Sequence, residues 1–257
     1  KEADITKTII AKFHNDPTLG IHQGVSRTKD AVSRRFYWTN MQDDIADYVR
    51  SCLDCQQRKK DPRHMTVEPL GTFIIPTKPF ARIHMDIMGP FPISRQDNTH
   101  VLSIQDSFTK FAVAIAVPNI TAEVVIDRFL RHFVYTFGPP ARLITDRGSN
   151  FMSAKFQTMC KTIGIKHEPT LPHQKNSNGQ VERLHRTIEE CLTHYLREDL
   201  SDWDLFLPKI VFALNNLSSS TTGLSPYIAL FGKDCRIALD AELNPLKDYQ
   251  EETLDTQ

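Results

Sequence analysis

The sequence predicts an α/β fold with a small helical module ahead of it. Residues 1–55 carry helical patterns that are too short to bury a large core of their own. A polar, basic and proline-containing stretch follows at 56–79 and predicts a linker. Residues 80–235 show short apolar or β-branched runs and then alternate between strand and helix patterns, which is typical of an α/β domain. Residues 236–257 are more polar and predict a tail.

Composition narrows the class of protein. The 257 residues include 31 basic and 31 acidic ones, so the uniformly basic surface of many nucleic-acid-binding proteins is excluded and any such surface must be local. No apolar run approaches the roughly 18 residues that a membrane span needs, so we expect no membrane contact. The five cysteines, only two of them closely spaced, favour a reducing compartment over a disulfide framework.

The helical module predicts two clear helices. Residues 27–36 and 41–51 have apolar positions at helical spacing, and Thr39 or Asn40 precedes the second as a candidate N-cap. Neither helix is long enough to form a stable core alone, so the module needs another source of stability.

The larger domain predicts strands first and then alternating elements. Thr121 can cap a helix whose apolar positions follow the i, i+3, i+4 spacing until Gly138 and two prolines end it. The order of elements indicates a meander of three strands, followed by alternating helices and strands. The expected strands are 83–88, 101–107, 111–117, 142–145 and 165–168, and the expected helices are 121–137, 153–163, 178–198 and 203–217.

Two histidines and two cysteines form a candidate metal site in the module. Seven residues separate His14 from His22, and Cys52 and Cys55 are spaced so that both sulfurs can reach one ion. Two imidazoles and two thiolates satisfy tetrahedral zinc with no open position, which is typical of a structural site. The alternative is a pair of surface histidines and a chance cysteine pair. We expect one structural Zn²⁺ here, whose removal unfolds the module while the larger domain survives.

Three acidic residues stand out in the larger domain. Asp86 lies within an apolar strand, Asp146 at the carboxyl end of a buried strand, and Glu182 in the first turns of a helix. A carboxylate in an apolar run costs roughly several kcal/mol unless it is paired or binds a metal, and metal ligation would explain Asp86 and Asp146. For Glu182 the alternative is an i, i+4 ion pair with Arg186.

These residues resemble those of a known family. Asp86 in MDIMGPFP, Asp146 in ITDRGSNF and Glu182 in NGQVERLHRTI, with 35 residues between the second and third acids, resemble the Asp-Asp-Glu core of retroviral and Gypsy-type retrotransposon integrases. The preceding two-His two-Cys set resembles the N-terminal zinc module of that family. The resemblance covers about residues 12–232. It is equally a resemblance to a host gene that was domesticated from such an element.

The resemblance implies a fold, a reaction and partners. It implies a ribonuclease-H-like integrase core in which Asp86, Asp146 and Glu182 are catalytic and bind two Mg²⁺ or Mn²⁺ ions. The implied reaction is 3′-end processing followed by strand transfer of element DNA into target DNA, by in-line phosphoryl transfer. DNA is the implied substrate, and a homo-dimer or tetramer is the implied assembly. A nuclear location is implied, with a cytoplasmic phase for an active element.

Local basic clusters are the candidate DNA contacts, because phosphate binding relies on Lys and Arg. The loop before the third acid departs from the family, since it reads PHQKNSN where Gypsy-type elements usually carry a Tyr-His-x-Gln-like run. This departure concerns rate and substrate preference more than metal binding. The candidate DNA-binding residues are Arg58, Lys59, Lys60 and Arg63 in the linker, and Lys175, Asn178, Arg183 and Arg186 around the third acid.

Three functions stay open at this point. The first is an active integrase, which the intact acid set favours. The second is a domesticated integrase-derived DNA- or protein-binding module with little or no catalytic activity and a role in chromatin or silencing, where chromatin proteins are possible partners. The altered loop and the neutral net charge favour this second function. The third is a general ribonuclease of the same fold, which the zinc module disfavours.

Overall fold

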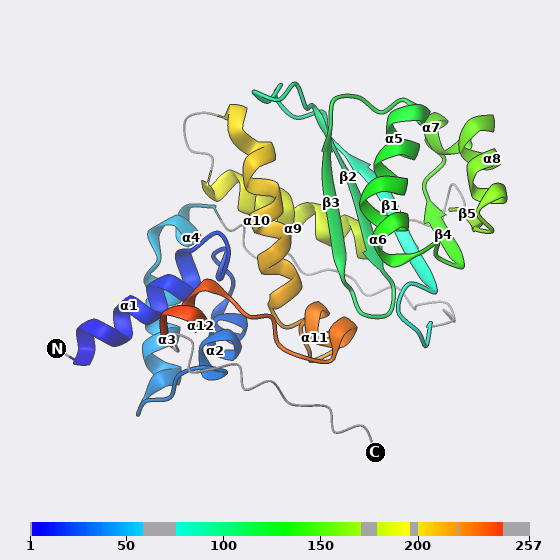
Figure 1. Ribbon diagram of the computed structural model, residues 1–257. Helices are drawn as coiled ribbons and strands as arrows, with labels where there is room; N and C mark the ends of the chain where they lie inside the picture. The colour runs from blue at the N-terminus through cyan, green and yellow to red at the C-terminus, as the bar shows by residue number, and fades with distance from the viewer. Residues whose placement is uncertain (1, 59–75, 171–178, 196–199, 220, 244–257) are drawn as a thin grey trace, which may run out of the picture.

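A five-stranded mixed sheet with helices on both faces forms the larger part of the chain, and four N-terminal helices pack beside it (Figure 1). The computed structural model describes residues 2–58, 76–170, 179–195, 200–219 and 221–243. Within these ranges a bilayer-spanning helix is absent, since none combines the required length with the required hydrophobicity.

The sheet has the strand order β3-β2-β1-β4-β5. β1 pairs antiparallel with β2, and β2 pairs antiparallel with β3, which is the expected meander. β4 is parallel to β1, and β5 is parallel to β4. The carboxyl ends of β1 and β4 therefore lie side by side. The strands are β1 Arg82–Met88, β2 His100–Asp106, β3 Ala112–Val117, β4 Arg142–Thr145 and β5 Lys166–Pro169.

The helices lie largely where the sequence predicts them, and Asn40 and Thr121 occupy the predicted N-cap positions. Asn40 precedes its helix in a left-handed conformation (φ 63°), and neither Asn40 nor Thr121 makes a side-chain capping hydrogen bond. Ser153 and Ser225 do cap their helices, by accepting from backbone N–H groups three residues on. The helices are α1 Glu2–Asn15, α2 Val25–Ser33, α3 Met41–Ser51, α4 Leu53–Arg58, α5 Ala122–Phe129, the π-helix η1 Leu130–Val134, α6 Tyr135–Phe137, α7 Ser149–Met152, α8 Ala154–Thr162, α9 Gly179–Tyr195, the 3-10 helix η3 Leu200–Asp202, α10 Trp203–Asn216, α11 Pro226–Phe231 and α12 Ala238–Leu243.

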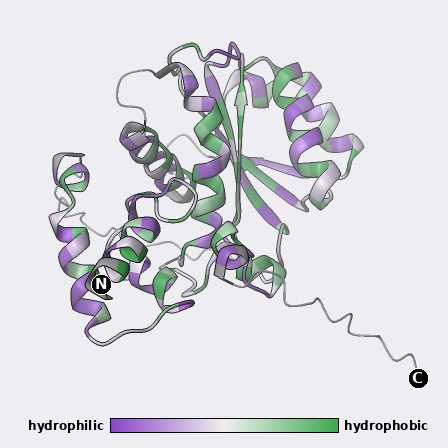
Figure 2. Ribbon diagram, turned by 60° about the vertical axis from the view of Figure 1, so that its left-hand side comes forward, coloured by the Kyte–Doolittle hydropathy of each residue, from purple (hydrophilic) through white to green (hydrophobic). Residues whose placement is uncertain are grey.

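Side chains of β3 alternate between the two helical layers. The β-branched residues at 113, 115 and 117 belong to the hydrophobic cluster on the α5 side, and the alanines between them pack toward α9 and α10. Small alanines let α10 approach β3 closely enough for a side chain to bond the strand. Asn215 accepts from Ala112 N and donates to Ala112 O, both at 2.8 Å. Figure 2 shows the hydrophobic residues along the sheet and on the helices beside it.

The N-terminal module and the larger domain share one hydrophobic cluster. Phe13, Val32 and Ile45 of the module belong to the same cluster as Ile188 of α9 and Trp203 of α10. Because these side chains shield one another from water, removing the module exposes apolar surface of the larger domain. The sequence analysis expected the larger domain to survive when the module unfolds, and this shared packing does not support that expectation.

The predicted polar tail begins with a packed helix. Ile237 and Leu239 are buried against the shared cluster, and Asp240 of α12 receives a hydrogen bond of 2.5 Å from Arg35 Nε in the module. A helix of six residues is too short to show a hydrophobic period in the sequence, so its packing could not be predicted. Residues 244–257, the rest of the predicted tail, lie outside the described residues.

Replacing Asn215 with Ala should lower the free energy of unfolding by about 1–3 kcal/mol, because it leaves a buried N–H and C=O of β3 without partners. Urea unfolding would measure the loss. Asn216→Ala is the matched control, because the Asn216 amide donates to Phe212 O within its own helix rather than to β3. Equal losses of stability in the two variants would show that the hydrogen bonds between Asn215 and Ala112 do not stabilise the fold.

Candidate metal sites

A tight turn after α1 brings His22 back against His14. Gly20 lies so close to α1 that a Cβ there would stand 2.3 Å from the Phe13 carbonyl oxygen, so only glycine fits. Ile21 and His22 adopt left-handed φ angles of 45° and 52°, and His22 N donates to His14 O at 2.7 Å. Gly20 ends the Pro-Thr-Leu-Gly run between the two histidines, so the turn that the sequence predicts there is present.

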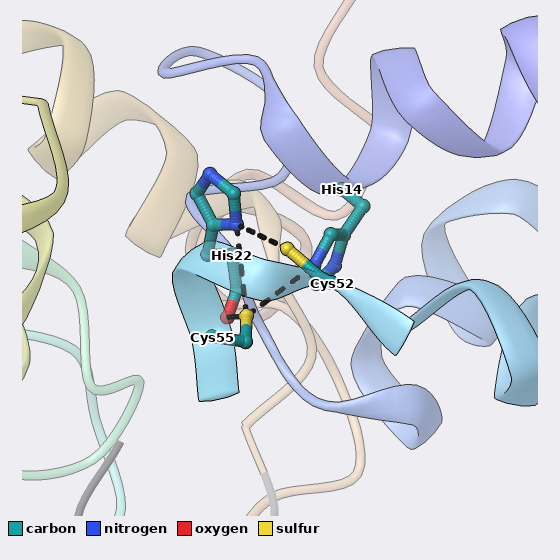
Figure 3. Close-up of side chains that lie close together, drawn as sticks. All are labelled: His14, His22, Cys52 and Cys55. Atoms are coloured by element: carbon teal, nitrogen blue, oxygen red, sulfur yellow. Dashed lines mark hydrogen bonds between the residues drawn. The ribbon is translucent and has the colours of Figure 1, made fainter. Parts of the chain in front are cut away.

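The four predicted zinc ligands meet between α1, α3 and α4 (Figure 3). Their ligand atoms all lie within 4.8 Å of one another. Cys52 Sγ lies 3.5 Å from His22 Nδ1, and Cys55 Sγ lies 3.4 Å from His14 Nε2 and 3.6 Å from His22 Nδ1. A tetrahedral ion with bonds of about 2.3 Å to sulfur and 2.0–2.1 Å to nitrogen holds S and N about 3.6 Å apart, so the donor set fits such an ion.

The His–Cys cluster rests directly on the last two turns of α9. The His22 ring stacks on the His194 ring, with centroids 4.7 Å apart and planes 11° apart. Tyr195 donates its hydroxyl proton to Asn15 O at 2.8 Å, at the end of α1. Because α9 also carries Glu182, one helix contacts both groups of predicted site residues.

The three predicted acids come from two parallel strands and α9. The pairing of β1 with β4 joins Arg82 to Arg142 and His84 to Ile144. Asp86 lies two residues beyond the last paired position of β1, and Asp146 follows the last residue of β4, so both lie toward the carboxyl ends of two adjacent parallel strands. Glu182 lies in the first turn of α9, which packs on β1 and β2, and its side chain is exposed.

Electrostatics shows that the three carboxylates lie near one another. Burial raises the pKa of Asp86 to about 6, against a hydrogen bond of 2.9 Å from Ile87 N that lowers it. The negative charges of Asp146 and Glu182 raise this pKa as well. Asp146 Oδ1 accepts a hydrogen bond of 2.9 Å from Gly148 N. The structure thus brings the predicted acids into one cluster of like charge.

The acids form an open cluster rather than a closed one. Among the residues described, only the two-His two-Cys group has all its ligand atoms within 4.8 Å of one another. Two divalent ions lie about 3.5–4 Å apart, so their ligands spread more widely than the ligands of one ion. Arg186 lies 4.0 Å from Glu190 and, in the described part of the chain, forms no ion pair with Glu182. The ion-pair alternative for Glu182 is therefore wrong.

A cleft lined by basic residues separates the module from the larger domain beside α9. Its volume is about 360 Å³, and Arg27, Lys110, Arg183 and Arg186 line it. Burial lowers the pKa values of Arg27 and Lys110, which the sequence analysis did not single out. Of the predicted DNA contacts, Arg183 and Arg186 are exposed on α9 and Arg58 ends α4, inside the start of the predicted linker. Lys59, Lys60, Arg63, Lys175 and Asn178 lie outside the described residues.

Asp86→Asn should stabilise the protein at neutral pH in buffer that lacks Mg²⁺ and Mn²⁺. The folded pKa of about 6 lies above the ordinary value of 3.8, so the carboxyl binds more protons folded than unfolded between these values. The free energy of unfolding therefore falls as pH rises through this window, and the full penalty is present above pH 6. We expect a gain on the order of 1–3 kcal/mol at pH 7.5 that vanishes below pH 4.

Urea unfolding at several pH values measures this gain. Asp47→Asn, at an exposed position of α3, controls for the substitution itself. A gain of equal size at pH 4 and pH 7.5 would show that removal of the Asp86 charge is not its cause.

Comparison with known proteins covers both parts of the chain. Residues 2–61 match the integrase zinc binding domain, and residues 76–175 match the integrase core domain. The chain is 33% identical over 227 residues to the retrovirus-related Pol polyprotein from transposon 412 of Drosophila melanogaster, which covers 88% of this chain and 18% of that protein. It is 26% identical over 228 residues to Gypsy retrotransposon integrase-like protein 1 of Bos taurus, which covers 89% of this chain and 44% of that protein.

A solved structure shares the fold across both parts. The simian T-cell lymphotropic virus intasome, solved in complex with the PP2A regulatory subunit B56 gamma, aligns with a TM-score of 0.56 and 20% identity over 89% of this chain and 76% of that chain. This likeness confirms the predicted ribonuclease-H-like core preceded by a zinc-binding module. The chain spans less than half the length of the curated relatives it matches. With both domains present in the family's order, the chain belongs to the integrases, and its relatives include Gypsy-type retrotransposon proteins.

Proposed function

We propose that this chain acts as a DNA integrase, a polynucleotidyl transferase that trims the 3′ end of an element's DNA and joins it to target DNA. The observation that carries the proposal is the cluster of Asp86, Asp146 and Glu182, which two parallel strands and α9 bring into electrostatic contact. Similarity to a retrovirus-related Pol polyprotein supports the same class of reaction. In-line phosphoryl transfer needs no protein nucleophile, so positioned carboxylates are the required groups.

The acid cluster is the proposed site of two divalent cations, Mg²⁺ or Mn²⁺. Carboxylate oxygens are the ligands that these hard cations prefer. Bound there, two ions would activate the attacking hydroxyl and absorb the charge that develops on the phosphate. The raised pKa of Asp86 reflects burial beside like charges, and cation binding would remove that penalty.

The His–Cys cluster is the proposed site of one structural Zn²⁺. Four protein donors complete a tetrahedral site and leave no position for substrate, so the ion would stabilise the fold rather than take part in the reaction. Its contact with α9 would extend this stabilisation to the helix that carries Glu182.

DNA is the proposed partner, and the basic cleft supports this. Arg183 and Arg186 line the cleft and lie within about one turn of Glu182 on α9, so phosphates held by them would lie along the same helix as that acid. We further propose that the chain works as a homo-dimer or tetramer in the nucleus, because joining two DNA ends to a chromosome requires more than one active site.

A domesticated integrase-derived binding module is the second candidate, with chromatin proteins as further partners. Similarity to Gypsy retrotransposon integrase-like protein 1 of Bos taurus and Homo sapiens, at 26% identity in both, favours it. The unusual loop at 172–178 lies outside the described residues. A pure binding module has no use for three clustered carboxylates at a cost in stability, so the acid cluster favours the enzyme.

We expect one zinc ion per chain in protein purified without chelator, and less than one in Cys55→Ser. Zinc binding at such sites is worth roughly 10–16 kcal/mol, which exceeds what a small helical module gains from its own core. Because the His–Cys cluster rests on α9, Cys55→Ser should also lower the melting temperature of the whole chain. Elemental analysis and calorimetry measure the two effects, with Cys235→Ser, outside the cluster, as control. Wild-type protein without stoichiometric zinc would refute the site.

Glu182→Gln should abolish DNA strand joining while leaving the fold intact, because it removes one ligand charge and keeps the shape of the side chain. We expect a loss of at least about 10²-fold in the joining of a labelled 3′ end to a second duplex with Mg²⁺ or Mn²⁺. Glu189→Gln, at an exposed position two turns along α9, is the matched control.

The assay needs the element's own terminal sequences. A wild-type protein that binds DNA or a chromatin partner, yet joins no more DNA than Glu182→Gln, would establish the binding-module function in place of the enzyme.

A further inference from the structure

A chain of polar side chains ends on the backbone of Asp146. Thr145, fully buried at the end of β4, donates its hydroxyl proton to the Asp146 carbonyl oxygen at 2.7 Å. His167 Nε2, on β5, lies 2.8 Å from the same hydroxyl oxygen. The other ring nitrogen, Nδ1, lies 2.8 Å from the amide nitrogen of Gln157 on α8. Three side chains from three elements therefore converge on one carbonyl group.

The hydrogen bonds of this chain all point in one direction. An amide nitrogen only donates, so Gln157 makes Nδ1 of His167 an acceptor and places the ring proton on Nε2. Nε2 then donates to Thr145 Oγ1, whose own proton goes to the Asp146 carbonyl. Burial lowers the pKa of His167, which favours the neutral ring that this direction requires. These hydrogen bonds form a relay in which each bond has one donor and one acceptor.

A second relay of the same construction ends on Asp86. Ser103, fully buried on β2 and paired with Asp86 in the sheet register, donates its hydroxyl proton to the Asp86 carbonyl oxygen at 3.1 Å. His185 Nε2 lies 2.5 Å from the same hydroxyl oxygen. The hydroxyl proton is already used, so the imidazole must donate. Burial lowers the pKa of His185 to about 4, so its ring is neutral near pH 7.

The second relay also ties α9 to the sheet. His185 lies three residues after Glu182, about one helical turn along the same face. Its bond to Ser103 therefore links α9 to β2 and, through the Ser103 hydroxyl, to the backbone of Asp86 on β1. All three acids are thus connected, through backbone or helix, to a pair formed by a fully buried hydroxyl residue and a half-buried imidazole.

We infer that Ser103 with His185 and Thr145 with His167 are positioning residues that hold the three acids in the geometry for binding divalent cations. This inference rests on the proposed function of the acid cluster. Metal ligands must be held to within about 0.5 Å, and hydrogen-bonded partners behind them commonly contribute 10–100-fold to metal affinity. Asp146 stands in particular need of support, because it lies one residue beyond the end of β4.

A purely structural role is the competing explanation. Buried hydroxyl and imidazole groups need hydrogen-bond partners wherever they occur, and removing one partner lowers stability without reference to any metal. The two explanations differ in metal affinity, since only positioning residues change it beyond the change in stability.

The test measures Mn²⁺ binding to the full, zinc-loaded chain by electron paramagnetic resonance of free Mn²⁺. The Asp86→Asn variant identifies the binding that belongs to the acid cluster. Thr145→Val keeps the side-chain shape and removes the hydroxyl, and Ser103→Ala removes the other hydroxyl. We expect each to raise the Kd for Mn²⁺ about tenfold or more. Thr28→Val is the matched control, because Thr28 is fully buried and its hydroxyl donates to a backbone carbonyl of the module, at Gln23.

A conservative pair of variants separates the lost donor from the lost ring. His185→Gln keeps an N–H donor near the position of Nε2, and His185→Leu does not. We expect the Gln variant to retain Mn²⁺ affinity within about threefold and the Leu variant to lose about tenfold. Equal affinities in these two variants would mean that the His185 hydrogen bond does not position the acids.

The possible results distinguish failure of the positioning inference from failure of the proposed integrase function. Thr145→Val and Ser103→Ala proteins that melt earlier but bind Mn²⁺ within twofold of the wild type would overturn the inference, and so would wild-type protein with no Mn²⁺ binding that depends on Asp86. If the variants bind Mn²⁺ more weakly than the wild type, as expected, but the wild type joins no DNA, the integrase function is refuted and the positioning role is supported.

Discussion

Both metal sites depend on the position of helix α9. Its buried residues Leu184, Ile188 and Cys191 belong to the cluster shared by the sheet layer and the N-terminal module, and each fully buried apolar side chain contributes roughly 1.5–3 kcal/mol. The first turn of α9 holds Glu182 near Asp86, and its last turns hold the ring under His22. A slip of one residue would rotate the helix face by about 100° and separate both sites at once.

The shared cluster makes the N-terminal module and the larger domain one packed unit. Arg34 pairs with Asp234 at 3.0 Å and Arg35 with Asp240 at 2.5 Å, so α12 and the segment that precedes it contact the module. These ion pairs are partly exposed and worth little individually, but they fix orientation where the apolar contacts supply most of the free energy. Metal binding in the module and the placement of Glu182 are therefore linked through packing.

At the carboxyl ends of β1 and β4, the carboxylates destabilise the fold while hydrogen bonds to their backbone stabilise it. Burial, with a smaller contribution from the negative charges of Asp146 and Glu182, raises the pKa of Asp86, so the ionised carboxylate costs stability in the absence of cations. The surrounding structure resists the repulsion through backbone contacts, since the hydroxyl groups of Ser103 and Thr145 bond the carbonyl groups of the acid-bearing residues. Hydrogen-bonded backbone beside carboxylates of like charge is the arrangement that the proposed divalent-metal site requires.

The sequence by itself determined the order of elements, the four residues of the His–Cys cluster and the three acids. Hydrophobic period, residue type and local spacing can all be read from residues that are close in sequence. Only the tertiary structure decided what those residues touch. The packing of α12, the stacking of His194 on His22 and the bonds of His167 and His185 all join segments far apart in sequence. A single sequence carries no signal for such contacts, since each depends on how two surfaces meet after both have folded.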